Sequence, residues 1–430
     1  MIKNYFKIAF RGFWKHKLFT LINVIGLSIG ISAALVIYLI VHFDFTFDKF
    51  HKDSDRIYRV VTSYTYSGEV GYNSGVCGPL GDAVRHLVTG VETTAPFYVL
   101  YQPNVFIAGK NNAPVRFKNQ DDVILADADY FKIFDYKWLA GSPVNNLNAP
   151  NQVVLTSDQA ERYFPGLSYD QMIGKTVTYD TIRTAVTGIV QTIKANTEFT
   201  FHDFISYSTN KANKSISDQL QLTAWGATTS QSQLFIKLSP KTSMARVEKQ
   251  LNDILHKNNK MEKGSSDAFH LQTLADIHFN ENYGGYGNRT ANKNTLYGLL
   301  AIAAFLLLLG CINFVNLTTA QATQRAKEIG IRKTMGSSRN QLVFQFLSET
   351  FFITLIAVII STGLTPLIIK LFADFIPAGV KANFLVQPDL IVFLIVLTLV
   401  VSLLSGFYPA ILLSGYKPVL VLKNQASVCK

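Results

Sequence analysis

The residues whose types could perform chemistry form no complete catalytic or metal site. Four carboxylates of the kind that bind calcium occur close together, at Asp121, Asp122, Asp127 and Asp129. No D-x-D-x-D-G loop follows them, so surface or helix-capping roles are favoured. His270 and His278 lack the spacing of a zinc site, and the chain has no H-E-x-x-H motif.

A phosphate-binding motif is also incomplete. Gly174-Lys175-Thr176 matches the end of a phosphate loop, but Tyr169 stands where that motif needs its first glycine. We interpret the match as coincidental and expect the chain to bind no ATP. The serines and histidines have no recognisable triad context. The sequence therefore predicts a chain with no catalytic residue, no metal and no cofactor of its own.

A different chemistry, recognition by charge, is concentrated in residues 324–348, which read QRAKEIGIRKTMGSSRNQLVFQFLS between two long apolar runs. Its first part carries Arg325, Lys327, Glu328, Arg332, Lys333 and Arg339. A segment with this charge does not cross lipid, and the positive-inside rule places it in the cytoplasm. We expect a cytoplasmic partner to bind it.

This basic segment also has the sequence features of two helices joined by a turn. Glu328 and Arg332 have the favourable i, i+4 spacing, Gly336 can stop a helix, and Ser338 with Gln341 resembles a capping box. Some apolar surface should remain on it, at Ile329, Ile331 and Met335. Such a surface suits a groove in a partner protein. The alternative is a solvated basic loop that only obeys the topology rule.

Hydropathy places this segment in a membrane protein. The chain has 430 residues, a pI near 9.3 and a mean hydropathy of +0.19. Four apolar runs are each long enough to span a bilayer: Leu18–Val41, Leu296–Leu317, Phe346–Phe372 and Leu390–Leu413. The first exceeds a signal-peptide core and no A-x-A-like site follows it, so it is interpreted as an uncleaved anchor.

Charge orients the four spans. Five cations and no acids precede the first span, whereas 25 basic and 25 acidic residues cancel between Asp44 and Thr295. The rest of the net charge of +11 lies mainly in the basic segment and in a tail with Lys417, Lys423 and Lys430. Both termini are therefore expected inside and the middle region outside. The excess charge meets anionic lipid headgroups, so no nucleic-acid partner is needed.

The predicted fold is an α-helical membrane protein with four transmembrane helices and a mixed α/β extracytoplasmic domain inserted between the first and second helices. The expected segments are a cytoplasmic amphipathic helix (1–17), TM1 (18–42), the outer domain (43–295), TM2 (296–319), the cytoplasmic coupling loop (320–345), TM3 (346–372), a short periplasmic loop (373–389), TM4 (390–413) and a cytoplasmic tail (414–430). Residues 1–17 could instead carry only flanking charge.

Local patterns give further expectations. In the outer domain, strands are expected at Val153–Thr156, Thr184–Ile193 and Leu234–Leu238, and a helix from Ser243 to Asn258.

Gly26 and Gly30 form a GxxxG motif that allows close helix packing. Asn313 and Asn316 should face another helix, by interhelical hydrogen bonding or along a ligand pathway. The topology separates the three cysteines, Cys77, Cys311 and Cys429, so no disulfide is expected.

The basic segment resembles a known family. Arg325-Ala-Lys-Glu-Ile-Gly330-Ile-Arg-Lys-Thr-Met-Gly336, followed by Ser337, Ser338 and Arg339, is similar to the cytoplasmic signature of ABC transporter permeases of the MacB/FtsX type. Residues 310–317 and 414–422 resemble flanking parts of that family. The outer domain resembles the MacB-like periplasmic core domain at 126–131, 151–156, 162–164, 186–188 and 274–278. The N-terminal pattern is most similar to versions from Bacteroidetes-like bacteria.

The resemblance implies a noncatalytic permease in the bacterial inner membrane. Its coupling element would contact a separate ABC ATPase subunit, which binds ATP and magnesium and drives movement of the periplasmic domain. Such movement serves efflux, lipoprotein handling or cell-wall regulation in similar proteins. Many similar permeases repeat the unit twice, so this chain is either a complete half-permease or a fragment of a longer protein. A complete half-permease is expected to pair with a second permease, identical or related, with a periplasmic adaptor as a further possible partner. Rival interpretations are a membrane-anchored ligand sensor and a cell-wall enzyme, and the sequence offers neither a signalling domain nor a catalytic constellation.

Overall fold

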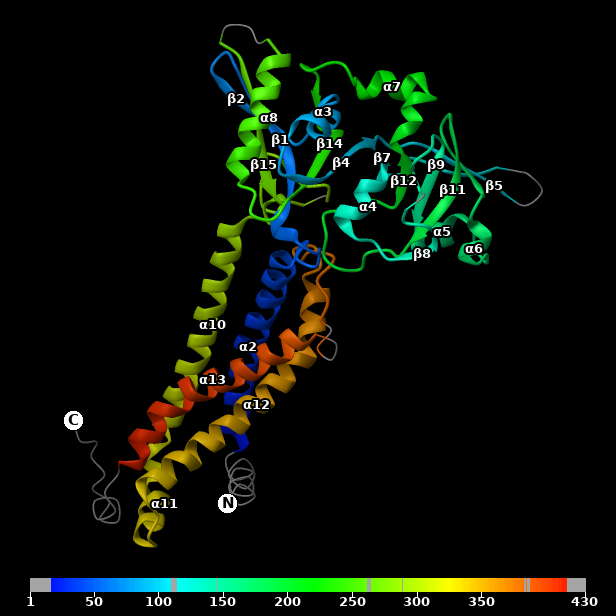
Figure 1. Cartoon of the computed structure of the whole chain (residues 1–430). Helices are drawn as coiled ribbons and strands as arrows, with labels where there is room; N and C mark the ends of the chain where they lie inside the picture. The colour runs from blue at the N-terminus through cyan, green and yellow to red at the C-terminus, as the bar shows by residue number, and fades with distance from the viewer. Residues whose placement is uncertain are drawn as a thin grey trace. The chain divides into compact units, whose positions relative to one another are not determined.

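The chain folds into two compact units. A computed structural model describes residues 17–109, 114–144, 146–260, 264–287, 289–382, 384 and 387–415. One unit, here called the helical unit, combines the chain up to Phe45 with the chain from Lys293, and the other, the outer unit, spans Thr46–Asn292 (Figure 1). The expected amphipathic helix at the N-terminus, the tail after Gly415 and Cys429 lie outside the described residues.

Five long helices form the described helical unit: α2 (Lys17–Phe45), α10 (Lys293–Ala320), α11 (Ala322–Thr334), α12 (Arg339–Leu371) and α13 (Pro388–Ser414). Among them, α2, α10, α12 and α13 are long and apolar enough to cross a membrane. The predicted fold class, four such helices with a mixed α/β domain between the first and second, is confirmed. Helix α12 starts at Arg339, ahead of the predicted membrane start at 346, because the Ser338 cap begins the helix there.

Helix α2 holds the helical unit together. Leu27 and Ile31 are buried in one cluster with Phe314 of α10, Ala357 of α12 and Val401 of α13. Polar contacts supplement this packing, because the Ser361 hydroxyl donates to the Ser28 carbonyl oxygen at 2.9 Å. A hydroxyl in this setting stabilises the contact between helices only if it finds an acceptor, since lipid offers none.

The outer unit is built on a mixed sheet of thirteen described strands. Its main path runs β15-β1-β14-β4-β7-β12-β9-β11-β10-β5-β6, with β2 added to β1 and β8 to β11, and β3 pairs separately with β13. The pairs β7–β12 and β9–β11 are parallel and the others are antiparallel. The strands are β1 (Ile57–Tyr66), β2 (Glu69–Asn73), β3 (Val76–Cys77), β4 (Val91–Leu100), β5 (Val105–Ala108), β6 (Pro114–Phe117), β7 (Val123–Ala126), β8 (Trp138–Gly141), β9 (Gln152–Thr156), β10 (Thr176–Tyr179), β11 (Ile182–Val190), β12 (Asp203–Ser206), β13 (Thr228–Thr229), β14 (Ser232–Leu238) and β15 (Ser266–Thr273).

Short helices connect and cover this sheet. They are η1 (Ser54–Arg56), α3 (Leu80–Leu87), α4 (Ala128–Phe134), α5 (Ser157–Tyr163), α6 (Tyr169–Met172), η3 (Tyr207–Lys211), α7 (Lys214–Leu220), α8 (Met244–Asn258) and α9 (Leu274–Ile277). The predicted strands at β9, β11 and β14 and the predicted helix after Ser243 are all present, although β11 ends at Val190 rather than at Ile193.

The central strands are buried on both faces. In β7, Ile124 and Ala126 join an aromatic-rich core, while Val123 and Leu125 join a second core on the opposite face. The two cores explain the continuous apolar runs of these strands, because a strand covered on both sides has no polar face. A third core lies beneath α8 and contains Val247, Leu251, Leu255, Phe269 and Leu271.

A buried carboxylate joins the two ends of the outer unit's chain. Glu198 accepts hydrogen bonds from the backbone N–H groups of Tyr286 and Gly287, both at 2.9 Å, and lies 2.6 Å from His278 Nδ1. Phe47, near the start of the unit, stacks on the His278 ring with centroids 3.6 Å apart. Burial raises the pKa of Glu198, but the His278 and backbone hydrogen bonds outweigh it, so this pKa lies below its ordinary value.

We expect Glu198→Ala to destabilise the outer unit by about 3 kcal/mol at neutral pH, because it leaves a buried histidine and two amides without their acceptor. Since the folded-state pKa is lowered, this stabilisation is complete above the pKa of an unfolded glutamate and is lost as the pH falls through the acid range. Urea unfolding of the full chain, followed by fluorescence of Trp138 and Trp225, measures both effects. Glu69→Ala, at an exposed carboxylate, is the control, and an equal loss in both variants would contradict the prediction.

Candidate functional site

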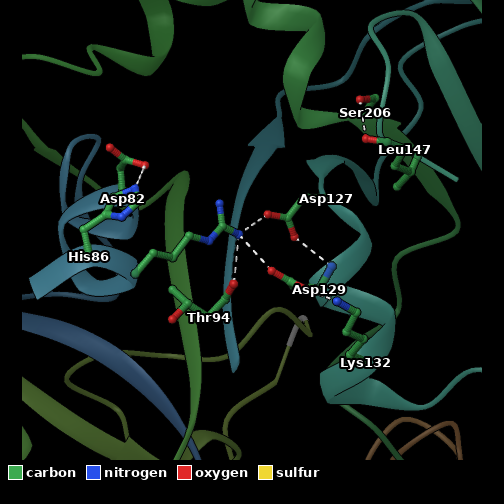
Figure 2. Close-up of polar contacts among 9 residues, drawn as sticks. Asp82, His86, Thr94, Asp127, Asp129, Lys132, Leu147 and Ser206 are labelled. Atoms are coloured by element: carbon green, nitrogen blue, oxygen red, sulfur yellow. Dashed lines mark hydrogen bonds and ion pairs between the residues drawn. The ribbon is translucent and has the colours of Figure 1, made fainter. Parts of the chain in front are cut away.

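Two of the four aspartates that could have suggested calcium have structural roles. Asp127 caps α4 by accepting a hydrogen bond from the Asp129 N–H at 3.1 Å (Figure 2). Both carboxylates also contact the Arg85 guanidinium. Arg85 also donates to the Thr94 carbonyl oxygen, and Lys132 pairs with Asp129 at 2.7 Å. No group of three or more metal-binding side chains occurs among the described residues. These contacts therefore join α3, β4 and α4.

The two histidines and the phosphate-loop-like segment considered above also make structural contacts. His270 Nε2 lies 2.8 Å from the Ser63 hydroxyl, and His278 contacts Glu198. Gly174 lies in a turn with φ of +80°, and Thr176 opens strand β10. A phosphate loop instead leads into a helix, whose N-terminal amides face the phosphate. The geometry around Gly174 therefore lacks the feature that holds a phosphate.

The basic segment forms the expected helix, turn and second helix. The turn is a Schellman motif, in which the Ser337 N–H donates to the Arg332 carbonyl oxygen and the Gly336 N–H donates to that of Lys333, both at 3.1 Å. Gly336 adopts φ of +97°, a conformation that side chains with a Cβ rarely take. After it, Ser338 and Gln341 form a reciprocal capping box that starts α12.

One face of α11 is buried against the rest of the helical unit. Ala326 and Ile329 are each only 1% exposed, and Gly330 is also buried. Ile329 packs in one cluster with Leu342 of α12 and Leu413 of α13. The prediction that Ile329 remains on the surface is therefore wrong, since the helical period turns it inward together with Ala326.

Two cations of α11 are used to hold the helix in place. Arg325 Nη1 lies 3.2 Å from Glu349 Oε2 of α12, and the guanidinium lies over the Phe19 ring of α2 at 5.8 Å. Lys333 Nζ donates to the Ser414 carbonyl oxygen at 2.6 Å, where α13 ends. A cation there also complements the negative end of the α13 dipole. Desolvation and the nearby Arg339 lower the pKa of Lys333.

The opposite face of α11 and the turn remain exposed. Met335 is 81% exposed and Ile331 is 45% exposed, and Arg339 is exposed as well. Arg332, Glu328 and Ser337 are partly exposed, whereas the side chain of Lys327 lies outside the described residues. The site residues predicted from sequence therefore divide into an anchoring set and a presented set. The presented set, which we call the docking face, is Ile331, Arg332, Met335, Ser337 and Arg339.

Sequence reasoning missed the partners that anchor α11. Glu349 is the one acidic residue within α12, and an acid inside a long apolar helix signals that a cation lies nearby. That signal was available in the sequence. The contacts with Phe19 and with the Ser414 carbonyl oxygen were not, because an aromatic ring and a backbone carbonyl have no distinctive sequence pattern.

The predicted packing residues also lie on α2 and α10. A Cβ added at Gly26 would lie 3.2 Å from Asn313 Nδ2, and one added at Gly30 would lie 3.2 Å from the Leu306 carbonyl oxygen. Both glycines therefore face α10 at close range. The Asn313 amide nitrogen therefore lies beside Gly26 of α2, as expected for a residue that faces another helix, although Asn313 remains exposed overall. Asn316 is exposed, so within the described chain the expected covering helix is missing at this residue.

Comparisons with known proteins agree with this architecture. The MacB-like periplasmic core domain profile matches residues 20–254, and the FtsX-like permease C-terminal profile matches residues 300–418. The uncharacterized ABC transporter permease YknZ of Bacillus subtilis is 35% identical over 101 residues, which are 24% of this chain and 24% of that protein. The macrolide export ATP-binding/permease protein MacB of Haemophilus ducreyi is 25% identical over 418 residues, which are 94% of this chain and 54% of that protein.

Among solved structures, the periplasmic region of MacB from Actinobacillus actinomycetemcomitans aligns with 48% of this chain and 87% of that chain, at 15% identity and a TM-score of 0.33. The chain spans from a quarter to about half the length of the two curated relatives named above.

We expect Gly336→Ala to destabilise the turn by about 1 to 2 kcal/mol, because alanine pays a steric cost at positive φ. Hydrogen exchange of the full chain in lipid nanodiscs should then show faster exchange of the amides of residues 331–337. Gly363→Ala is the matched control, since this glycine is helical and a Cβ there meets nothing within 4 Å. Unchanged exchange in the Gly336 variant would mean that the turn does not depend on this glycine.

Proposed function

The chain belongs to the family of permeases with a MacB-like periplasmic core domain and an FtsX-like C-terminal region, and we propose that it is the membrane subunit of an ABC transporter. In this proposal a separate cytoplasmic ATPase binds ATP and magnesium, and this chain performs no catalysis. Its task is to carry the motion of the ATPase to the periplasmic domain. Four apolar helices and a periplasmic-type domain are consistent with a protein of the inner membrane.

The observation that carries the proposal is the division of α11 into a fixed face and a docking face. Arg325, Ile329 and Lys333 hold the helix against α12 and α13. Ile331 and Met335 stay exposed beside basic side chains. Exposed apolar residues flanked by cations suit a groove with an apolar floor and acidic rim on a partner protein. A partner that pushes on this face pushes on a helix that cannot easily slip.

The covalent order of elements offers a route for this motion. Helix α11 is separated from α10 by the single residue Gln321, and α10 runs without interruption from Lys293, where the outer unit's chain has just ended. Helix α2 leads into the same unit from its other end, at Phe45. In the proposal, displacement of α11 therefore reaches both ends of the outer unit through two continuous helices.

The same proposal includes a second permease copy. Asn316 is exposed on α10, a helix long and apolar enough to lie in lipid. Carboxamides that face hydrocarbon are costly, and a neighbouring helix relieves the cost by hydrogen bonding. An identical or related subunit that covers this face of α10 would supply such a helix. An adaptor on the periplasmic side is a further proposed partner.

We expect the double variant Met335→Glu and Arg339→Glu to reduce recovery of an ATPase with the tagged chain by at least about tenfold, because both changes oppose a groove that is apolar and acidic. The measurement is affinity purification from membranes of the native host, followed by vanadate-sensitive ATP hydrolysis and mass spectrometry. Lys175→Glu, an equally drastic change at an exposed residue of the outer unit, is the control and should leave recovery unchanged. Undiminished recovery would refute the docking role, and copurification of a histidine kinase would favour a sensor.

The proposed orientation places both termini and α11 in the cytoplasm. In a chain whose native cysteines are replaced, Met335→Cys should react with a membrane-impermeant maleimide only after the membrane is broken, whereas Tyr101→Cys should react in intact spheroplasts. The two positions are a matched pair, since Met335 is 81% and Tyr101 is 80% exposed. The reverse labelling pattern would overturn the orientation.

A further inference from the structure

The described residues of the outer unit leave part of one sheet face uncovered. Helix α8 packs Val247, Leu251 and Leu255 in one core with Phe269 of β15, and it ends at Asn258 (Figure 1). Asn259, the next residue, donates from Nδ2 to Asp267 Oδ2 at 3.4 Å. On the same face, near the end of β1, Tyr64 and Tyr66 are 43% and 66% exposed.

An open groove of about 680 Å³ lies on this uncovered face. Tyr64 is paired with Gly71 on β2 and with Asp267 on β15. Directly opposed residues in antiparallel strands point to the same face, so these three form a row on one sheet face, and Tyr64 and Asp267 of this row line the groove. Its sides include Asn73, Thr228, Asn259 and Lys260.

The Tyr64 ring lies down on the sheet because residue 71 is a glycine. A Cβ at position 71 would overlap the ring carbons and the hydroxyl of Tyr64. Without that Cβ, one side of the ring rests on the backbone of β2 while the residue remains exposed toward the groove. The pair therefore forms a flat aromatic platform that the backbone of β2 supports.

The lining of the groove selects among classes of ligand. Apart from the two tyrosines, the described residues that line the groove have threonine, serine, asparagine, lysine and aspartate side chains, and none of these described residues is aliphatic. Their surface gives little apolar contact to a lipid tail or an apolar peptide. Among the described lining residues the charged groups are the Lys260 ammonium and the Asp267 carboxylate. The formal charges of these two groups cancel, which favours a neutral ligand.

We propose that this groove binds a neutral oligosaccharide, with one sugar ring stacked on Tyr64 and its hydroxyls bonded to Asn73, Asn259 and Asp267. Carboxamides and a carboxylate supply both donors and acceptors, as a polyhydroxylated ligand requires. The C–H face of a pyranose ring matches the flat aromatic platform. The open form of the groove suits a chain of sugars rather than an enclosed small molecule. Partial burial raises the pKa of Asp267.

This binding needs neither ATP nor the ATPase, so it can fail or succeed independently of the proposed transporter function. The full chain is reconstituted in lipid nanodiscs free of maltoside detergents, because a maltoside headgroup is itself a sugar. The probes are the tetramer of β-1,4-linked N-acetylglucosamine, maltotetraose, and the uncharged peptide Ser-Gly-Ser-Gly. Saturation-transfer NMR titrations report both the affinity and the sugar protons that touch the protein.

We expect saturation transfer to at least one tetrasaccharide, strongest at ring C–H protons, and none to the peptide. Tyr64→Ala and Gly71→Ala should each weaken binding roughly tenfold, the first by removing the platform and the second by lifting the ring from β2. Tyr72→Ala is the matched control, because Tyr72 lies on the other face of β2, against Tyr283, and binding should stay within about twofold. Trp fluorescence during urea unfolding verifies that each variant is folded.

Three results would overturn the proposal. One is the absence of saturation transfer to both tetrasaccharides at millimolar concentration. Another is binding that a folded Tyr64→Ala variant retains in full. The third is equal binding of the peptide, which would assign the groove to a different class of ligand.

Discussion

A charge cannot remain unpaired in lipid, and this constraint governs how the helical unit is built. The basic residues outside the outer domain gather at the ends of the apolar runs, where water or headgroups can solvate them. Where an ionic group does enter the helical unit it has a partner, as Arg325 has in Glu349. The pair is only partly exposed, so removal of one partner would leave a costly single charge. The need to pair Arg325 therefore helps to fix the position of α11 against α12.

Much of this arrangement could be predicted because it depends on local rules. Helix length, the Ser338 capping box and the Gly336 stop are set by neighbouring residues, and the structure contains each of them. The strands β9, β11 and β14 were likewise visible as β-branched runs. The order of the strands in the sheet could not be predicted, because β1 pairs with β14 and β15 across more than 170 residues of sequence. Such pairings depend on which faces fit together, and one sequence does not reveal that.

The candidate site was predicted in extent but not in orientation. Hydropathy and charge placed the basic segment between two spans, yet Ile329 and Lys333 face inward while Ile331 and Met335 face outward. An i, i+4 pattern identifies residues that share a face, but it does not tell which face is covered when several helices surround the segment. Asn316 illustrates the opposite case, because a polar residue in an apolar run predicts a partner helix that the described chain does not contain. A polar side chain left exposed on an apolar helix in this way is a candidate contact for another subunit.

The anchoring of α11 determines how force could pass through it. Each of its fixed contacts reaches a different place: Arg325 to α12, Lys333 to the end of α13, and Ile329 to the core between those two helices. Rotation of α11 about its own axis would break the ion pair, and sliding along the axis would expose Ile329. Both movements cost more free energy than moving the packed helices together, because closely packed helices shift as units. A helix held at three separated points and continued almost directly into α10 is therefore better suited to transmit displacement than to absorb it.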